Sequence, residues 1–208
     1  MNRTFSSSSS RICRRVSLLL VVFLLCAPSV SLPESLDELA VALQSKDASR
    51  KEAALEKFVK EYFPKDPEQG RLWSKKESRK IDRILLRLLA DPDPQIQLQA
   101  IGLSVKSTSA APINEVAKLL TDHNDEIRAA AARIYIMVDA SDDVLRQLEK
   151  LLKDENDAVR KAATYSLGPH CKRTLPAVIR EAYQNEQDKD LKQSLAETLE
   201  CSLQRQGR

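Results

Sequence analysis

Aromatic residues and glycine are scarce in this chain, and their scarcity restricts the fold. Phe, Trp and Tyr together make up 4% of the 208 residues, and glycine occurs only 4 times. A β-sandwich or β-barrel needs many turns and many rings that pack between strands, so this composition argues against both. Stretches rich in Ala, Leu, Glu, Lys, Gln and Arg instead favour helices. The sequence therefore predicts an all-α fold.

Side chains with metal-binding or catalytic chemistry are also few. The only histidines, His123 and His170, do not stand at metal-ligand spacing from another His or Cys, and we expect both to be exposed turn residues. A glycine-rich phosphate loop, a nucleophile elbow and an HExxH motif are all missing. The acidic clusters at 122–126 and 154–157 lack the spacing and glycine of an EF-hand, and helix capping accounts for them. We therefore expect no catalytic residues, no cofactor and no metal.

Acidic residues are missing from residues 1–31, which contain four arginines. Subtracting these from the 33 basic residues of the whole chain leaves 29 against 30 acidic ones, a net charge of −1. Nucleic-acid binding normally requires a basic surface. The sequence therefore argues against a nucleic-acid partner.

The same N-terminal segment has the layout of an export signal. A Ser- and Arg-rich stretch precedes the apolar run 17–26, which is followed by small residues, so we expect cleavage after Ser31. The apolar run is shorter than the roughly 20 residues of a membrane-spanning helix. We therefore expect an exported protein, periplasmic or secreted. Two alternatives are a lipid anchor at Cys26, where the preceding Leu25 does not fit a bacterial lipobox, and an organelle transit peptide.

A block of similar residues recurs about every 32 positions, at 91–97, 122–128, 154–160 and, in a weaker copy, 186–192. An apolar pair precedes each block, and small residues such as alanine follow the central copies. Apolar residues at helical spacing on both sides of a turn with capping side chains indicate two helices in each unit. One such pair cannot bury both its apolar faces alone, so we expect stacked copies that share a core.

Two of these blocks carry a resemblance to a known family. Asp-x-Asn-x-x-Ile-Arg-x-Ala-Ala at 122–131 and Asp-x-Asn-x-x-Val-Arg-x-Ala-Ala at 154–163 resemble HEAT repeats, and more closely the PBS-lyase-type HEAT-like repeat. The resemblance covers about residues 81–203. It implies a right-handed superhelical α-solenoid of helical hairpins, in which the turn Asp pairs with the Arg of a neighbouring repeat. Gln97 and Lys192 replace that Arg in the outer copies, which implies looser junctions there.

Upstream of the array, the apolar faces of another helical pair are present, but the turn signature is missing. A segment with two prolines and a glycine then interrupts the pattern, and Trp73 beside it is expected to anchor a partner or, preferably, to cover the core. The predicted parts of the chain are a signal peptide at 1–31, a degenerate N-terminal helical repeat at 32–63, a loop insertion at 64–74, and an array of about four HEAT-like repeats at 75–208.

The resemblance also implies a function and a binding face. HEAT-like scaffolds hold a protein or peptide on the inner face formed by the second helix of each pair. We therefore expect a non-catalytic exported scaffold whose partner lies on the exposed positions of these helices. The predicted partner-binding residues are Arg133, Lys161, Tyr165, Gln193 and Glu197.

Two further groups of residues are singled out by their spacing. Basic residues recur every four positions before the first block, and this basic ridge could meet lipid headgroups or an acidic partner, although acidic residues between them favour a solvated face. Its members are Arg71, Lys75, Arg79, Arg83 and Arg87. Cys171 and Cys201 lie 30 residues apart, nearly one repeat, so either a disulfide or two separate reduced thiols fits the pattern.

Two alternative functions remain open. PBS-lyase-type repeats also occur in proteins that attach or detach bilin chromophores, so a bilin lyase-like enzyme or a chromophore-binding protein is the first. Binding to a membrane surface through the basic ridge is the second.

Overall fold

All regular secondary structure in the described residues is helical, which confirms the predicted all-α class. The computed structural model describes residues 35–63 and 73–204, so the predicted export segment and Arg71 lie outside the described residues. The α-helices are α2 (Leu36–Ala42), α3 (Ala48–Tyr62), α4 (Lys75–Leu89), α5 (Pro94–Ser104), α6 (Ala110–Lys118), α7 (Asp125–Arg133), α8 (Asp142–Leu151), α9 (Asp157–Leu167), α10 (Pro176–Asn185) and α11 (Lys189–Gln204). The described part of the chain also has three short 3₁₀ helices, η2 (Leu119–Thr121), η3 (Ile134–Ile136) and η4 (Gly168–Arg173). Across the described residues, none of these helices has both the length and the apolar content to cross a membrane.

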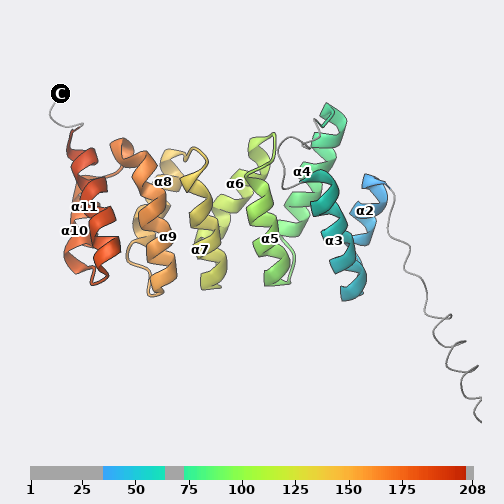
Figure 1. Cartoon of the computed structure of the whole chain (residues 1–208), viewed down its shortest axis with the longest axis horizontal. Helices are drawn as coiled ribbons and strands as arrows, with labels where there is room; N and C mark the ends of the chain where they lie inside the picture. The colour runs from blue at the N-terminus through green and yellow to red at the C-terminus, as the bar shows by residue number, and fades with distance from the viewer. Residues whose placement is uncertain (1–34, 64–72, 205–208) are drawn as a thin grey trace, which may run out of the picture. The chain divides into compact units, whose positions relative to one another are not determined.

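The chain divides into two compact units, residues 1–58 and 59–208, with the boundary inside α3. In the second unit the helices form four consecutive hairpins, α4–α5, α6–α7, α8–α9 and α10–α11, which follow one another side by side in chain order (Figure 1). We call the first helix of each hairpin its A helix and the second its B helix. Stacked hairpins of this kind make the array an α-solenoid, as the resemblance implies.

The turn between the two helices of each hairpin is built by the recurring acidic block. Its third residue caps the B helix: the side-chain oxygens of Asp93, Asn124, Asn156 and Asp188 accept N–H bonds from the first turn of α5, α7, α9 and α11. The first residue of the block, Asp91, Asp122, Asp154 or Glu186, accepts the backbone N–H of that capping residue. The acidic clusters therefore serve as helix caps.

The core of the second unit forms between apolar A-helix side chains and small B-helix side chains. On α4, the buried residues Ile81, Leu85 and Leu88 recur at helical spacing. On α7 and α9, buried alanines allow a close approach, and the Ser166 hydroxyl donates a 2.7 Å hydrogen bond to the Ala132 carbonyl. Each fully buried large aliphatic side chain stabilises the fold by about 1.5–3 kcal/mol.

The first unit contains the same kind of turn, which the sequence reasoning missed. Asp47 caps α3 by accepting the Arg50 N–H at 3.1 Å, and the Asp47 N–H in turn donates to the Ser45 hydroxyl at 3.1 Å. Ser45 thus stands where the later repeats have an acidic residue. The turn therefore forms without the sequence signature of the later repeats, because a serine hydroxyl accepts the same bond as a carboxylate.

Trp73 lies in the second unit directly before α4. Its ring packs edge-on against Phe63, with ring centroids 5.2 Å apart. Its indole nitrogen is buried and donates no hydrogen bond within the described residues. This contact fits a ring that covers the core and not a free anchor for a partner.

Candidate partner-binding face

The exposed side of the B helices carries all five predicted partner-binding residues. Arg133 lies on α7, Lys161 and Tyr165 on α9, and Gln193 and Glu197 on α11, and each side chain is exposed. Their helices pack against one another in the order α7, α9, α11. We call this surface, together with the exposed side of α5, the B-helix face.

Three of these residues occupy equivalent positions of successive repeats. Arg133, Tyr165 and Glu197 follow one another at intervals of 32 residues, and Gly102 holds the matching position on α5. One row across the face therefore changes from a basic residue through an aromatic ring to a carboxylate. Side chains in one row of a solenoid point to the same side, so a single extended partner can contact all three.

A shallow hollow of about 260 Å³ lies on this face between α9 and α11. The Tyr165 ring and the Glu197 carboxylate border it, and the Gln193 side-chain amide donates to Glu197 Oε1 at 2.8 Å, which orients that carboxylate. Tyr165 is one of the few large apolar side chains left exposed in the described residues. The residues that line the hollow are Thr164, Tyr165, Gly168, Ser194, Glu197, Thr198 and Cys201.

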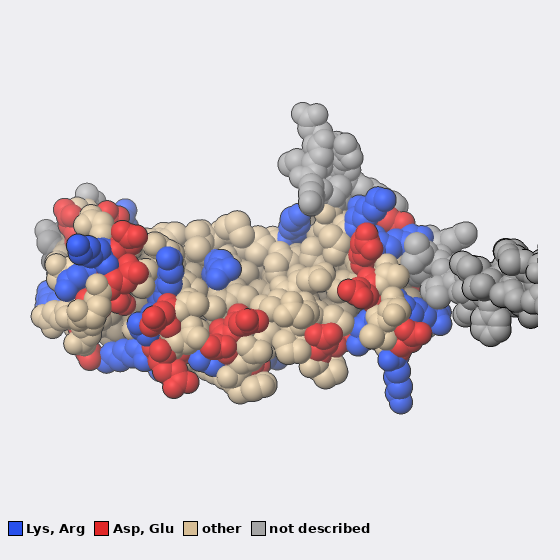
Figure 2. Space-filling view, turned by 60° about the horizontal axis from the view of Figure 1, so that its bottom comes forward, with Lys and Arg blue, Asp and Glu red and all other residues tan. Residues whose placement is uncertain are grey.

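Charged side chains are unevenly distributed over the molecular surface. Figure 2 shows a broad uncharged area in the middle of the molecule, with acidic and basic side chains gathered around it. The sequence of α5, Pro94–Ser104, contains no charged residue. A partner can therefore approach the exposed side of α5 without stripping water from charges of that helix.

The sequence reasoning missed two exposed apolar residues in the repeat formed by α6 and α7. Ile136 ends η3, the 3₁₀ helix that follows α7, and Met137 comes next; their side chains are 42% and 71% exposed. They lie one helical turn beyond Arg133, at the end of the B-helix face. The sequence signal that could have found them is their helical spacing, since they lie three and four residues after Arg133.

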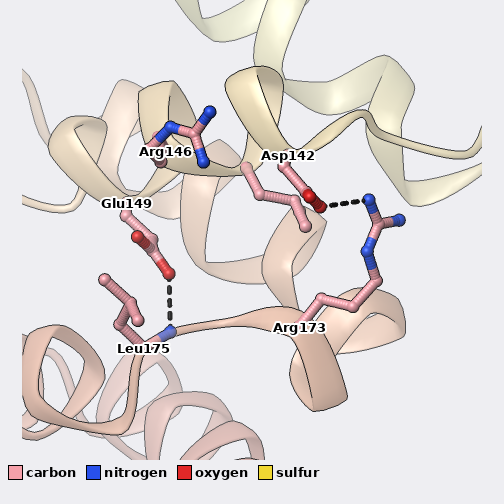
Figure 3. Close-up of a pocket in the computed structure, with 6 residues that line it drawn as sticks. Asp142, Arg146, Glu149, Arg173 and Leu175 are labelled. Atoms are coloured by element: carbon pink, nitrogen blue, oxygen red, sulfur yellow. Dashed lines mark hydrogen bonds and ion pairs between the residues drawn. The ribbon is translucent and has the colours of Figure 1, made fainter.

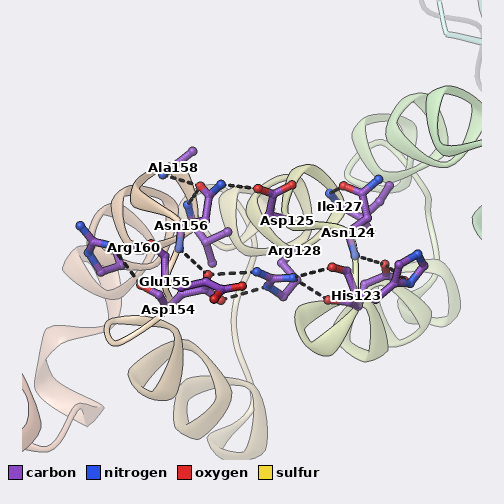
Figure 4. A network of polar contacts seen from close by, with 12 residues as sticks. His123, Asn124, Asp125, Ile127, Arg128, Asp154, Glu155, Asn156, Ala158 and Arg160 are labelled. Atoms are coloured by element: carbon purple, nitrogen blue, oxygen red, sulfur yellow. Dashed lines mark hydrogen bonds and ion pairs between the residues drawn. The ribbon is translucent and has the colours of Figure 1, made fainter.

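An ion-pair network joins the turns of neighbouring repeats (Figure 4). Arg128 on α7 binds the Asp154 carboxylate of the next repeat with two N–H groups, each at 3.0 Å, and also donates to the Asp122 and His123 carbonyls of its own turn. Asp154 in addition accepts the Asn156 N–H. This is the pairing that the resemblance implies, and it locks two repeats together.

The network also shifts the pKa values of Asp154 and Arg128. Burial raises the pKa of Asp154, but the hydrogen bonds from Arg128 and from the Asn156 N–H outweigh it and hold this pKa below its usual value. The hydrogen bond to Asp154 is the main cause that raises the pKa of Arg128. Both groups are therefore charged at neutral pH, and the pair rigidifies the edge of the B-helix face.

The outer copies of the block make different contacts. Gln97, in place of the Arg, donates to the Leu89 carbonyl of its own hairpin at 2.9 Å. Lys192 donates to the Glu186 carbonyl at 3.4 Å and lies over the Tyr183 ring, 5.2 Å from its centroid. Neither side chain reaches a carboxylate of an adjacent repeat in the described residues.

A disulfide joins Cys171 and Cys201. Cys171 in η4 and Cys201 in α11 have their Cα atoms 5.7 Å apart. The bridge ties the end of the α8–α9 hairpin to the last B helix, beside the hollow that Cys201 lines. The positions of the two cysteines near the ends of adjacent B helices make this short Cα distance possible.

The described part of the basic ridge is exposed along one helix. Lys75, Arg79, Arg83 and Arg87 all lie on α4 with exposed side chains, while Arg71 is outside the described residues. Arg83 Nε donates to the Arg79 carbonyl at 3.2 Å. Within the described residues, none of these four cations forms an ion pair.

The acidic residues beside the ridge have other partners. Glu77 forms a capping box with Ser74 at the start of α4. Asp82 accepts the hydroxyls of Ser107 and Ser109, both at 2.7 Å, and so links α4 to the start of α6. Both carboxylates are therefore engaged elsewhere and do not pair with the described ridge cations, although they alternate with them in the sequence.

The two histidines have different environments. His123 is exposed in its turn, as expected, and its Nδ1 lies 3.1 Å from Oδ1 of Asp122. The expectation was wrong for His170, whose side chain is only 10% exposed, because its ring nitrogen Nε2 bonds the Tyr135 carbonyl at 3.0 Å. Among the described residues, no group of His, Cys, Asp and Glu side chains could hold a metal ion.

Comparison with known proteins extends these observations. A family model described as HEAT repeats matches residues 81–168 and 113–200. Two crystal structures of engineered proteins resemble the fold, each with a TM-score of 0.53 and 18% sequence identity. The alignment covers 82% of this chain and 80% of the first engineered chain, and 81% of this chain and 47% of the second. At this identity the likeness concerns the fold alone. No curated protein matches the chain. The narrower PBS-lyase-type assignment stays a prediction.

Proposed function

The chain belongs to the HEAT-repeat family, and from this premise we propose that it is an exported, non-catalytic scaffold that binds a protein or peptide on its B-helix face. HEAT-repeat solenoids generally serve as non-enzymatic scaffolds for protein–protein interactions. The observation that carries the proposal is the row Arg133, Tyr165 and Glu197 on successive B helices, beside the hollow between α9 and α11.

The residue types in this row suit a protein partner. Tyr and Arg are enriched among the residues that contribute most to binding energy, because they combine a large contact area with hydrogen-bonding groups. The exposed Ile136 and Met137 add apolar surface at one end of the face. The partner that fits best presents an acidic side chain to Arg133, an apolar one to Tyr165 and a basic one to Glu197.

The links between repeats support binding without large rearrangement. The Arg128–Asp154 pair and the Cys171–Cys201 disulfide both join neighbouring hairpins next to the B-helix face. A preorganised face loses less conformational entropy on binding than a mobile one.

A site-specific photo-crosslinker tests the face. We expect benzoylphenylalanine at Tyr165 to form one discrete adduct in the producing cells, and the same residue at Lys118, exposed on the A helix α6, to form none. With the purified adduct partner, Tyr165→Ala should weaken binding at least about tenfold, the loss of a residue worth more than ~1.4 kcal/mol. Adducts from Lys118 with none from Tyr165 would contradict the proposal.

Export rests on the N-terminal sequence and has its own test. A disulfide between Cys171 and Cys201 suits an oxidising compartment, which supports this part of the proposal. We expect the intact mass of the native protein to match a chain that starts near Leu32 and to rise by two hydrogens on reduction. A mass that starts at Met1 would rule out cleavage.

Membrane-surface binding is a second candidate, favoured by the exposed ridge residues Lys75, Arg79, Arg83 and Arg87 on α4. Sedimentation with anionic vesicles tests it: binding that disappears at high salt and in the variant Arg79→Glu with Arg83→Glu would support this function. The bilin alternative stays a prediction, and a visible chromophore after co-expression with bilin synthesis would support it.

A further inference from the structure

A second cavity lies on the A-helix side of the array, away from the B-helix face. It has a volume of about 340 Å³ and lies between α8 and the segment that joins η4 to α10 (Figure 3). This is at the small end of the roughly 300–1,000 Å³ that small-ligand sites occupy, so it suits one side chain better than a large cofactor. Its lining residues are Asp142, Leu145, Arg146, Glu149, Arg173 and Leu175.

Glu149 is the unusual member of this lining. Its side chain belongs to α8, is only 5% exposed, and directs one carboxylate oxygen, Oε1, to the Leu175 N–H at 2.7 Å. Within the described residues, its other oxygen has no hydrogen bond and its charge has no ion pair. Burial raises the pKa of Glu149, although the Leu175 N–H and the nearby Arg146 lower it. A buried carboxylate without a cation is costly, and such groups are normally paired.

The two arginines of the cavity already have carboxylate partners. Arg173 donates to Asp142 at 2.6 Å and to Asp139 at 3.1 Å. Arg146 forms an ion pair with Asp143, one turn earlier on α8. The four acidic residues around the cavity thus outnumber the two arginines, and the local field favours a further positive charge.

We propose that this cavity binds the side chain of a lysine presented by a peptide or protein partner, with its ammonium group donating to the free carboxylate oxygen of Glu149. The buried Leu145 and the 55% exposed Leu175 border the same space and would contact the aliphatic part of the lysine. This contact is separate from the B-helix face and does not depend on the proposed function.

The hydrogen-bond arrangement favours lysine over arginine. A guanidinium binds a carboxylate best through two parallel N–H bonds, which need both oxygens. In this cavity Oε1 of Glu149 already accepts the Leu175 N–H, so a single oxygen remains. An ammonium group is a compact charge and needs only one such acceptor.

The amide of Leu175 offers a direct reporter, because it donates to the carboxylate in question. We would titrate ¹⁵N-labelled protein with N-acetyl-lysine methylamide, the arginine analogue and the uncharged norleucine analogue. We expect a saturable shift of the Leu175 amide resonance with the lysine probe, binding at least about fivefold weaker with the arginine probe, and no saturable shift with norleucine. Equal binding of the arginine or norleucine probe would overturn the proposal.

Two variants separate the charge of Glu149 from its structural role. Glu149→Gln keeps an oxygen for the Leu175 N–H and removes the charge, so binding of the lysine probe should weaken at least about tenfold. Glu197→Gln, on the B-helix face, should leave it unchanged. As a measurement on the unaltered protein, the carboxyl carbon of Glu149 should titrate at lower pH when the probe is bound. Unchanged affinity in Glu149→Gln, or an unchanged titration with saturating probe, would overturn the proposal.

Discussion

At the scale of single residues, the ion pair between Arg128 and Asp154 joins two neighbouring repeats. Their side chains are only 12% and 10% exposed, and they are joined by two charge-assisted bonds. A buried pair contributes little over a well-packed apolar substitute, but removing one partner leaves an unpaired buried charge. A substitution that removes only one partner should therefore destabilise the fold far more than replacement of both by apolar residues.

Arg128→Ala should lower the free energy of unfolding by about 3–5 kcal/mol, because it strands the Asp154 carboxylate and frees two turn carbonyls. The matched control is Arg160→Ala, at the equivalent position one repeat later. Arg160 also donates to two carbonyls of its own turn, but its side chain is 25% exposed and its contact with Glu186 in the next repeat is a single one of 3.6 Å. Its loss should therefore cost less than that of Arg128, by roughly 2 kcal/mol. Urea denaturation monitored by circular dichroism measures both. Equal losses would show that the bidentate geometry is unimportant.

The acid limb of the stability profile should carry the signature of Asp154. Its folded-state pKa is lowered, chiefly by Arg128 against the opposing effect of burial. A lowered carboxyl pKa stabilises the fold above the unfolded value of about 3.9, and this contribution is lost as the pH falls through the folded value. Asp154→Asn should be less stable near pH 7 and should lose less further stability below about pH 4. Parallel profiles for the two proteins would contradict this assignment.

At the scale of helices, the sequence predicted the turns well because their chemistry is local. A short acceptor side chain two or three residues before the apolar face fixes where a B helix begins, and Asn124 and Asn156 cap α7 and α9 as expected. The 3₁₀ helix η4 was not predicted, since Gly168 and Pro169 indicate only that α9 ends. The buried position of His170 and the cavity beside Glu149 were missed for the same reason, because both depend on how η4 packs against other repeats.

The disulfide acts at this scale, by tying η4 to α11. Replacing both cysteines with Ala should lower the free energy of unfolding by about 2–4 kcal/mol, since the unfolded chain gains freedom in the loop of 30 residues. The local effect should be uneven: amide hydrogen exchange should accelerate more in α11 than in α7, which is two hairpins away from the chain end. Uniform acceleration would show that the bridge does not act locally.

At the scale of the whole array, the repeat period predicted stacked helical pairs that share a core, and the resemblance to HEAT repeats implied the solenoid and its B-helix face. Stability in such arrays is approximately a sum of the repeats and the interfaces between neighbours. The junctions are unequal here: α7 and α9 share the Arg128–Asp154 pair, whereas Gln97 on α5 bonds within its own hairpin. The junction between α5 and α7 should therefore be easier to strengthen.

Gln97→Arg tests this inequality, since it restores the repeat's arginine opposite Asp122 of the next turn. We expect a gain of about 1 kcal/mol in the free energy of unfolding, which must vanish when Asp122 is replaced by Asn, because the gain requires the carboxylate across the junction. Asp122→Asn alone keeps an oxygen for the Asn124 N–H, so the double-mutant cycle isolates the new pair. An equal gain with and without the Asp122 carboxylate would mean that the introduced guanidinium stabilises its own helix and forms no pair across the junction.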